Sequence, residues 1–553
     1  MGAGIEGERR PETAPDECRA VERGAALLLA YNSPMIRRSL LWLAASAVAL
    51  TALGVPYLLA YRGQPASHVF SGFLVNPIDG FSYFAKMRQG FDGAWLFQLP
   101  YTDNPGPGTF LFVYYLLLGH VERILGADRG LVYHAARLLG ASLMFAAAYA
   151  LFQRALPGDR MRRWAFGLVL FGSGLGWLGA VVGRLTIDLW VPEAIPFFAG
   201  YANAHFALAS AALIVGLLAV GCDRLSRPTR LAWAVISGIV LALVQPFALI
   251  TVLAVASVWL LWMRARPADG FAPDAWRERA GVLGSFLLAS APFLVYDAYV
   301  TSSIPQLSAW SAQNRTPTPP LVDVLLGLGI PLLLAGYGAW ISRADSSAAR
   351  RLFLVWVGVT LVLVFFPIPL QRRMFLGIFF PLAGLAGVAL DRIGSGQARS
   401  PRWLAYVLFA LCLPTNLVVT AATVGGAARQ EPEVVLSADE AEAYRWVRDS
   451  IPTGSVVLAG DISGNRLPAF APVRVMYGHP FETPEAERSL AFVEGLLGSS
   501  GAEQDVLEAL RERSVEYVFV GDRERDLGPL TWLADLLPVY EQGGVIIYQV
   551  PFP

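Results

Sequence analysis

The sequence has little charge and almost no cysteine. Only 16% of its 553 residues are Asp, Glu, Lys or Arg, whereas 55% are hydrophobic. Ordinary soluble chains carry roughly 25% charged residues. A water-soluble globule cannot cover so much apolar surface with so little charge, and a disordered chain would be far more polar, so both classes are excluded. The three cysteines, Cys18, Cys222 and Cys412, are too few and too far apart for a disulfide framework or a metal-ligand motif.

Net charge is also lacking, and so is lysine. The 43 basic residues balance the 43 acidic residues, which leaves no electrostatic argument for a nucleic-acid partner. Lysine occurs once, as Lys86, and every other basic residue is arginine. No small-residue cleavage site follows the first apolar run, so we expect a retained first helix and not a signal peptide.

Long apolar runs are what the sequence has in abundance. A helix of about 20 residues crosses the ~30 Å of hydrocarbon in a bilayer. We therefore predict a polytopic α-helical membrane protein with about 11 transmembrane helices. The runs are 39–61, 131–152, 164–183, 204–221, 231–246, 247–263, 280–298, 320–341, 352–367, 374–390 and 403–423.

The distribution of arginine predicts the orientation in the plasma membrane. With the N-terminal tail 1–38 in the cytoplasm, the cytoplasmic segments hold 23 arginines and the outer segments of the membrane part hold nine basic residues, as the positive-inside rule requires. Counting the apolar stretch 108–125 as a further span would invert part of this pattern. We therefore expect 108–125 to be an outer-face or partly re-entrant helix within a first outer loop, 62–130. Eleven spans then place the C-terminus outside.

The composition changes after about residue 430, where charge becomes dense and apolar runs shorten to strand length. Ser437 and Glu440 form a capping-box pattern at a helix start. The alternation of strands and helices predicts an extracytoplasmic α/β domain, 430–553, after a transmembrane domain, 39–425. The predicted strands are 456–460, 473–477, 515–521 and 544–550, and the predicted helices are 437–450, 484–498 and 502–513.

Polar side chains near the start of the first outer loop form a candidate site. After Asn76, a helix is predicted on which Asp79, Tyr83 and Lys86 share one face. A carboxylate beside a cation and an aromatic ring suits a general base that deprotonates an acceptor hydroxyl. The alternative is that Asp79 only caps the helix and Lys86 only anchors it at the membrane surface. Aromatic side chains are expected to lie along the membrane interface: Phe81, Phe84, Phe91 and Trp95.

This arrangement resembles the GT-C glycosyltransferases over about residues 39–425. The shared pattern is one span, a long outer loop with an early acidic residue, many further spans and an outer α/β tail. Protein mannosyltransferases, the lipid A aminoarabinose transferase and oligosaccharyltransferase catalytic subunits belong to this family. The resemblance implies a polyprenyl-phosphate-sugar donor and, by position, a catalytic Asp79. Many members have a paired acidic motif there, whereas this chain has Ile78-Asp79.

A second outer loop carries Asp188, Glu193, Asn203 and His205. The resemblance implies a second acidic group or a metal ligand in this loop. Oxygen and imidazole groups of this kind could hold a divalent cation, Mg²⁺ or Mn²⁺, that screens a phosphate. The alternative is an ordinary polar loop in which His205 caps the next span.

A third cluster, Gln371, Arg372 and Arg373, is predicted at the outer mouth of a span, against the positive-inside trend. The planar fork of arginine pairs with phosphate oxygens. We therefore expect Arg372 and Arg373, with Lys86, to bind the phosphate of a polyprenyl-phosphate leaving group. The alternative is contact with lipid headgroups or with an acidic loop.

In the C-terminal tail, polar residues lie at or near predicted strand ends, where α/β domains place ligands. We expect them to cap the site or to grip the acceptor. They are Asp461, Asn465, His479 and Glu482.

Together these patterns predict a membrane glycosyltransferase. It would move a sugar from the lipid-linked donor to a hydroxyl of a glycan, lipid or protein acceptor at the outer face, with inversion at the anomeric carbon. Two other classes stay open, a lipid-carrier flippase or transporter and a non-catalytic membrane scaffold. The span centres carry almost no charge, which argues against a transport path.

Overall fold

A computed structural model describes residues 34–222, 225–269, 271–272, 274–398, 400–499, 503–534 and 536–552. Most of the predicted tail 1–38, including Cys18, lies outside these ranges. The chain divides into two units, Met1–Ala49 and Leu50–Pro553. Helix α2 (Pro34–Gly63) runs from the first unit into the second, and the features described below belong to the second.

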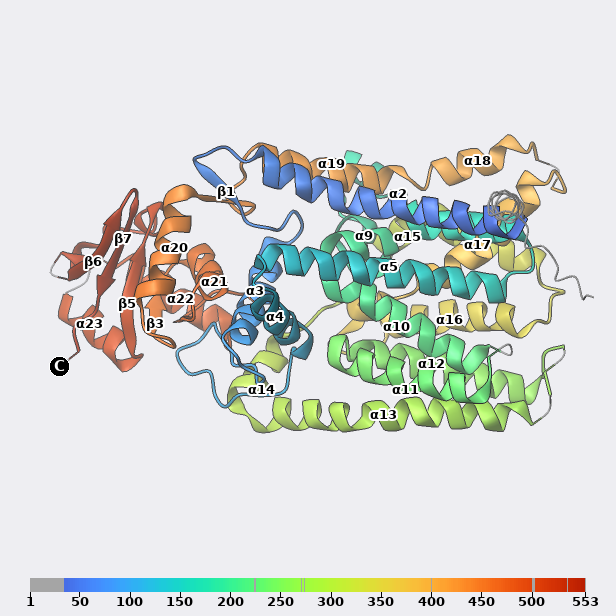
Figure 1. Cartoon of the computed structure of the whole chain (residues 1–553), viewed down its shortest axis with the longest axis horizontal. Coiled ribbons are helices and arrows are strands. Elements are labelled where there is room, and N and C mark those ends of the chain that lie inside the picture. Colours follow the sequence, from blue (N-terminus) through green and yellow to red (C-terminus); the bar gives the residue numbers. More distant parts are fainter. Residues whose placement is uncertain are drawn as a thin grey trace, which may run out of the picture. The chain divides into compact units, whose positions relative to one another are not determined.

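Eleven segments of the described chain are helical, long enough and apolar enough to cross a membrane, and each coincides with a predicted run. The third, tenth and eleventh are each built from two shorter helices. Figure 1 shows the long helices, such as α5 and α13, running in the same general direction. Beyond α2, the membrane helices are α5 (Arg129–Ala155), α6 (Asp159–Phe171), α7 (Gly176–Val181), α10 (Ala204–Gly221), α11 (Arg227–Val244), α12 (Phe247–Ala265), α13 (Ala275–Ser303), α15 (Leu321–Ile341), α16 (Ala348–Phe365), α17 (Phe379–Gly394), α18 (Trp403–Ala410) and α19 (Pro414–Ala428).

Short helices connect the spans at the end where the candidate residues lie. The stretch 108–125 contains α4 (Val113–Leu125), whose 13 residues reach only about 20 Å. This length is too short for a span, as predicted, because the hydrocarbon core is about 30 Å thick. The other connecting helices are α3 (Pro77–Phe91), α8 (Ile187–Trp190), η1 (Pro192–Ala194), α9 (Pro196–Ala202), α14 (Pro305–Gln313) and η2 (Gln371–Phe375).

Helices α3 and α4 cross at two glycines. A Cβ atom on Gly90 would lie 2.1 Å from the carbonyl oxygen of Leu116, and one on Gly119 would lie 1.9 Å from that of Met87. Both distances are far below van der Waals contact, so no side chain fits at either position. The crossing therefore holds α3, which carries Asp79, tightly against α4.

The C-terminal region contains a five-stranded mixed sheet in the order β4-β3-β5-β7-β6 (Figure 1). Strand β3 pairs in parallel with β4 and β5, whereas β7 is antiparallel to β5 and β6. The strands are β3 (Val456–Leu458), β4 (Arg474–Val475), β5 (Val515–Val520), β6 (Leu537–Gln542) and β7 (Val545–Gln549). The helices of the region are α20 (Ala438–Ser450), α21 (Asp461–Phe470), α22 (Ala486–Leu497), α23 (Glu503–Glu512), α24 (Asp522–Arg525) and η3 (Thr531–Leu533).

Most of these elements were expected. All four predicted strands and all three predicted helices are present, and Ser437 and Glu440 form the capping box. Strand β6 is absent from the predicted set: it is a mostly exposed edge strand with Pro538 inside it, and proline weakens the sequence signal for a strand. Helix α21 is also absent from that set, and Pro468 lies inside it.

A two-stranded sheet joins the first outer loop to the C-terminal region. Strand β1 (His68–Phe70) pairs antiparallel with β2 (Val435–Ser437). The pairing places the start of the loop beside the start of the C-terminal region, so both lie at one end of the helices. The contact between the first outer loop and the C-terminal region is apolar. Phe81 and Phe84 are buried in it, with 1% and 6% of their surface exposed. The expectation that these two rings lie along the membrane interface is therefore wrong, because the C-terminal region and α5 cover them.

Candidate active site

Asp79 lies in the first turn of α3. Asn76 adopts the left-handed conformation with φ of 45°, and Pro77 follows at the first helical position, where its fixed φ suits a helix start. The Asn76 side chain donates a 2.6 Å hydrogen bond from Nδ2 to Oδ2 of Asp79. A carboxylate at this end of a helix is also stabilised by the helix dipole. The chain thus fixes the direction of Asp79 locally, and the helix cap is Asn76 and not Asp79.

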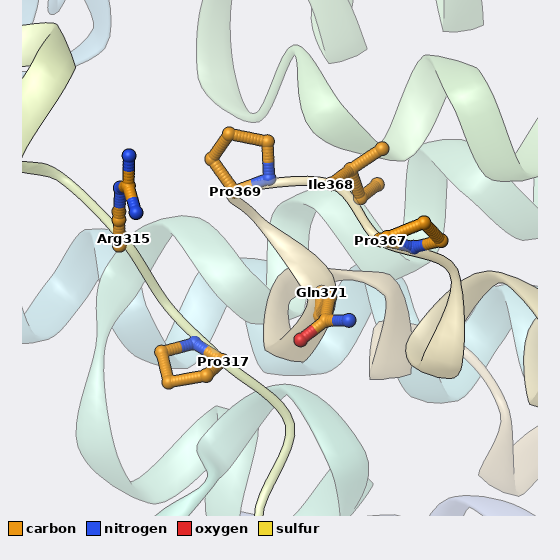
Figure 2. Close-up of a pocket in the computed structure, with 6 residues that line it drawn as sticks. All are labelled: Arg315, Pro317, Pro367, Ile368, Pro369 and Gln371. Atoms are coloured by element: carbon orange, nitrogen blue, oxygen red, sulfur yellow. The ribbon is translucent and has the colours of Figure 1, made fainter.

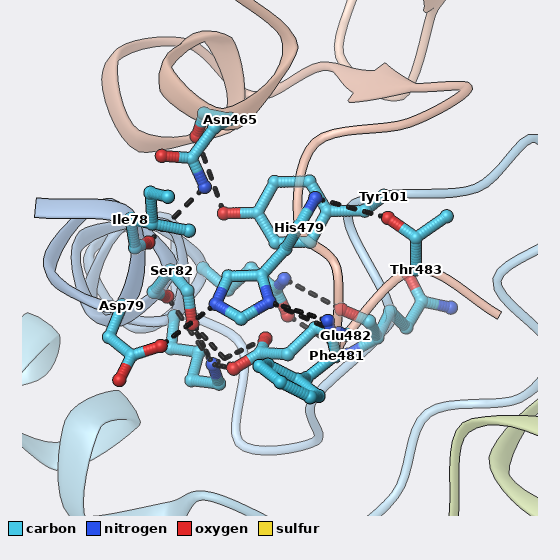
Figure 3. A network of polar contacts seen from close by, with 12 residues as sticks. Ile78, Asp79, Ser82, Tyr101, Asn465, His479, Phe481, Glu482 and Thr483 are labelled. Carbon is cyan, nitrogen blue, oxygen red and sulfur yellow. Dashed lines mark hydrogen bonds and ion pairs between the residues drawn. The ribbon is translucent and has the colours of Figure 1, made fainter. Parts of the chain in front are cut away.

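The other carboxylate oxygen of Asp79 meets the C-terminal region. His479 lies in the segment after β4, and its Nε2 is 3.0 Å from Oδ1 of Asp79. The two side chains point toward each other across the junction (Figure 3). His479 is 3% exposed and Asp79 is 29% exposed, so a group outside the protein still has access to the carboxylate.

The surroundings of Asp79 keep its carboxylate ionised. Burial alone would raise its pKa, but the hydrogen bond and electrostatic effect of His479, together with the charges of Arg373 and Lys86, outweigh burial, so the pKa lies below its ordinary value. Residues of three separate segments therefore act on this one carboxylate.

Lys86 is fully buried and bound to the same C-terminal segment. Its ammonium lies 2.7 Å and 2.8 Å from the two carboxylate oxygens of Glu482 and 2.5 Å from Oγ of Ser82. Ser82 also donates a 2.6 Å bond to Glu482. Burial would raise the pKa of Glu482, but the charge and hydrogen bond of Lys86, with smaller effects of His479 and Ser82, together outweigh burial and hold this pKa below the ordinary value. In this structure the hydrogen-bonding capacity of Lys86 is thus taken up by protein partners.

The predicted arginine pair lies at the start of the tenth span, in η2. Arg373 forms a 3.0 Å ion pair with Glu193, and the Arg372 guanidinium stacks 4.7 Å from the ring centre of Trp190. Within the described part of the chain, the buried Nε atoms of both arginines have no hydrogen-bond partner. Two buried donors without an acceptor cost on the order of 1–3 kcal/mol each, which makes this cluster a candidate anion site.

An open cavity of about 550 Å³ is lined by Gln371, the residue that precedes the arginine pair. Gln371 lines it and donates to Phe366 while accepting from the backbone of Thr318. Figure 2 shows two facing segments that form its walls. The lining residues are Arg315, Pro317, Pro367, Ile368, Pro369 and Gln371. The cavity is mainly apolar and has one cationic residue, Arg315, in its lining, which suits a phosphate attached to a lipid chain.

Aromatic side chains pack between α3, α4 and the start of α10. Tyr83 stacks on Tyr115 with ring centres 4.4 Å apart, and the Tyr115 hydroxyl is 2.7 Å from Nδ1 of His205. Asn203 donates a weak 3.5 Å bond to the Tyr83 hydroxyl. Burial raises the pKa of Tyr83 well above its ordinary value, and the charge of Asp79 raises it further. Tyr83 therefore stays protonated beside the candidate base.

The predicted second-loop residues do not converge. Asp188 is fully buried and accepts hydrogen bonds from Ser173, Thr186 and the backbone amides of Gly174 and Gly176; burial nevertheless raises its pKa. Glu193 binds Arg373, and His205 binds Tyr115. Within the described residues, no group of three or more His, Cys, Asp or Glu side chains is arranged to hold a metal ion.

The C-terminal residues contribute unequally. His479 and Glu482 reach the site, and Asn465 donates a 3.2 Å bond to the carbonyl oxygen of Ile78, next to Asp79. Asp461 bonds only to the next backbone amide, that of Ile462, among the contacts described. Ser82 was not a candidate, although its place three residues after Asp79 and four before Lys86 puts it on their face of the helix. Trp190 and Tyr115 carried no sequence signal, because stacking partners on other segments depend on the fold.

The fold is that of the GT-C glycosyltransferases. The oligosaccharyltransferase from Archaeoglobus fulgidus, tethered with an acceptor peptide containing the NVT sequon, is 13% identical with a TM-score of 0.51 over 91% of this chain and 74% of that one. ArnT from Cupriavidus metallidurans in the apo state is 14% identical with a TM-score of 0.54, and the match covers 92% of this chain and 98% of that one. The same ArnT bound to undecaprenyl phosphate is 13% identical with a TM-score of 0.51, and the match covers 91% of this chain and 98% of that one. No protein-family model and no curated protein matches the sequence. The resemblance seen in the sequence is thus confirmed at the level of the fold.

Proposed function

We propose that this protein is an integral-membrane glycosyltransferase that moves a sugar from a polyprenyl-phosphate donor to an acceptor hydroxyl at the outer face of the plasma membrane. The observation that carries the proposal is the pairing of an ionised, partly accessible Asp79 with two arginines whose buried Nε donors lack acceptors. A base and an anion site are the two groups that such a transfer needs.

The fold supports the choice of donor. A protein of this fold, ArnT, is known in complex with undecaprenyl phosphate. The apolar cavity is lined by Gln371, the residue before Arg372 and Arg373, and by a third arginine, Arg315. We propose that a polyprenyl chain lies along this cavity and that its phosphate accepts hydrogen bonds from the two arginines.

In the proposed reaction the acceptor oxygen attacks C1 of the sugar while the bond between C1 and the phosphate oxygen breaks. The acceptor proton moves to Asp79, and the negative charge that develops on the leaving phosphate is held by Arg372 and Arg373. The base and the phosphate site lie on opposite sides of the sugar in this scheme, so the product has the inverted anomeric configuration. Lys86 stays a predicted phosphate ligand, but only if it leaves Glu482.

The test uses the purified protein in liposomes with polyprenyl-phosphate sugars extracted from the native membrane. Wild type should release polyprenyl phosphate and form a glycoside whose anomeric configuration, read by proton NMR, is inverted. Asp79→Asn should lower the rate by about 10²–10⁴. Wild-type rates in a folded Asp79→Asn variant would refute the base, and movement of intact donor across the bilayer without transfer would favour a flippase instead.

A further inference from the structure

Resting on this proposed function, we propose that His479 is a positioning residue: it donates a hydrogen bond from Nε2 that orients the Asp79 carboxylate, so the C-terminal region completes the active site. The contact is 3.0 Å long and nearly buried on the histidine side. It joins side chains 400 residues apart in the chain.

The segment around His479 determines which ring nitrogen carries the proton. The backbone amides of Phe481 and Glu482 both donate to Nδ1, at 3.1 Å and 3.2 Å. An amide N–H can only donate, so Nδ1 acts as the acceptor and carries no proton. The proton of the neutral ring therefore lies on Nε2, and the bond to Asp79 runs from histidine to carboxylate. Figure 3 shows the ring held between the segment and Asp79.

The rest of the segment is braced in the same conformation. Oγ1 of Thr483 accepts from the backbone amides of Gly478 and His479, at 3.3 Å and 3.1 Å. The Thr483 amide donates to the His479 carbonyl at 3.0 Å, and Glu482 is anchored on Lys86. His479 is thus presented to Asp79 by a rigid turn, as a positioning group must be.

The two bonds to Asp79 leave room for a substrate. Asn76 occupies a position on Oδ2 and His479 a position on Oδ1, whereas an ionised carboxylate has about four acceptor positions. The free positions can accept the proton of an incoming hydroxyl. Asn76 and His479 hydrogen-bond to Asp79, and the charges of Arg373 and Lys86 act on it. Arg372, His205 and Tyr83 also face it closely enough to interact with its charge.

Two substitutions separate the roles of the two ring nitrogens. His479→Asn retains an oxygen near the Nδ1 position, which can still accept from the segment amides, but it is too short to reach Asp79. His479→Gln places an amide N–H near the Nε2 position and keeps the bond to Asp79. Phe481→Ala is the matched control, because this neighbouring ring is 45% exposed and, although its centre lies 6.3 Å from that of the His479 ring, it has no polar atom that could bind Asp79.

The first measurement is the infrared titration of the reconstituted protein. The Asp79 band is identified by subtracting the spectrum of Asp79→Asn in each background. We expect His479→Asn to raise the midpoint of this band by about one pH unit, as loss of one charge-assisted hydrogen bond predicts. His479→Gln and Phe481→Ala should leave the midpoint near that of wild type. An unchanged midpoint in His479→Asn would overturn the proposal.

The second measurement is the transfer assay. His479→Asn should lower kcat about tenfold or more at unchanged KM, and His479→Gln should restore most of it. Equal kcat losses in the Asn and Gln variants would mean that His479 only supports the fold, which would also overturn the proposal. If Asp79→Asn itself transfers sugar at the wild-type rate, the proposed base fails, while the infrared shift still decides the contact with His479.

Discussion

Arg372 and Arg373 lie side by side at the start of the tenth span, and each keeps a buried Nε donor without a partner among the described residues, as Arg230 does at another span. Arg373 is oriented by Glu193, and Arg372 is oriented by the Trp190 ring. Both guanidinium groups are therefore fixed in direction before any ligand arrives, which reduces the entropy that binding costs.

This arrangement predicts that Arg372→Ala weakens binding of undecaprenyl phosphate by about 10–100-fold, since one hydrogen bond to a charged group is lost. Titration of the lipid into protein in nanodiscs, followed by native mass spectrometry, measures the affinity. Arg343→Ala is the control, because Arg343 also stacks on a tryptophan, Trp340, in a segment predicted to face the cytoplasm. Equal affinities of wild type and Arg372→Ala would remove Arg372 from the phosphate site.

The ionisation of Asp79 determines the pH dependence that we expect for the proposed reaction. A base must be ionised, and the pKa of Asp79 lies below its ordinary value of 3.8 because the effects of His479, Arg373 and Lys86 outweigh burial. The value of kcat/KM should therefore stay level above pH 4 on the acid side and fall only as the pH drops through this lowered pKa. A pH–rate profile measures this limb. An acid limb near pH 6 that vanishes in Asp79→Asn would contradict the lowered pKa.

At the scale of elements, the Lys86–Glu482 pair ties α3 to the C-terminal segment. Glu482→Gln removes the charge that compensates a fully buried ammonium, so we expect a loss of about 3–5 kcal/mol in the free energy of unfolding. The pKa of Glu482 is lowered by Lys86, and the stabilisation is therefore present above pH 4.5 and lost as the pH falls through the lowered pKa.

Chemical denaturation in detergent micelles, followed by tryptophan fluorescence, measures this loss. Glu431→Gln is the control, because the Arg429–Glu431 pair is exposed and should contribute at most about 1 kcal/mol. Similar effects of the two substitutions would mean that the buried pair does not hold the segment.

The close crossing of α3 and α4 is expected to contribute to both stability and activity. Gly119→Ala would place a methyl group 1.9 Å from the Met87 carbonyl oxygen, so the helices must separate, at a cost of about 1–3 kcal/mol. The shift also moves Asp79, and we expect transfer activity to fall together with the melting temperature.

Gly336→Ala in α15 is the matched control, since its Cβ would meet nothing within 4 Å and alanine favours helix. This variant should be as stable as wild type or slightly more so. If Gly119→Ala keeps both the wild-type melting temperature and activity, the close crossing is not what positions α3.

At the scale of the whole molecule, β1 and β2 join the first loop to the C-terminal region, and eleven spans put both on one side of a membrane. We predict that this side is the outside. In a background without the native cysteines, Ser302→Cys and Ser450→Cys should react with a membrane-impermeant maleimide on intact cells. Gln397→Cys, in a segment predicted to be cytoplasmic, should react only after permeabilisation. The reverse labelling pattern would invert the proposed topology.

The sequence predicted a large part of this fold and named most members of the site. Asp79, Tyr83 and Lys86 do share α3, and His479 and Glu482 were singled out at strand ends. What could not be predicted is that Lys86 binds Glu482 and that His479 binds Asp79. These pairs join segments about 400 residues apart, and nothing in the local pattern of either segment specifies the other.

By itself the sequence determined the membrane embedding, the eleven spans and four of the five strands of the C-terminal sheet. These depend on the length and period of local apolar runs, whose transfer free energies are set by the residues themselves. Only the tertiary structure decided which polar groups meet. It placed the C-terminal segment on α3, buried Phe81 and Phe84 instead of leaving them at the lipid surface, and left two arginine donors without acceptors. Such contacts exist only once distant segments pack together, because each depends on the position of its partner.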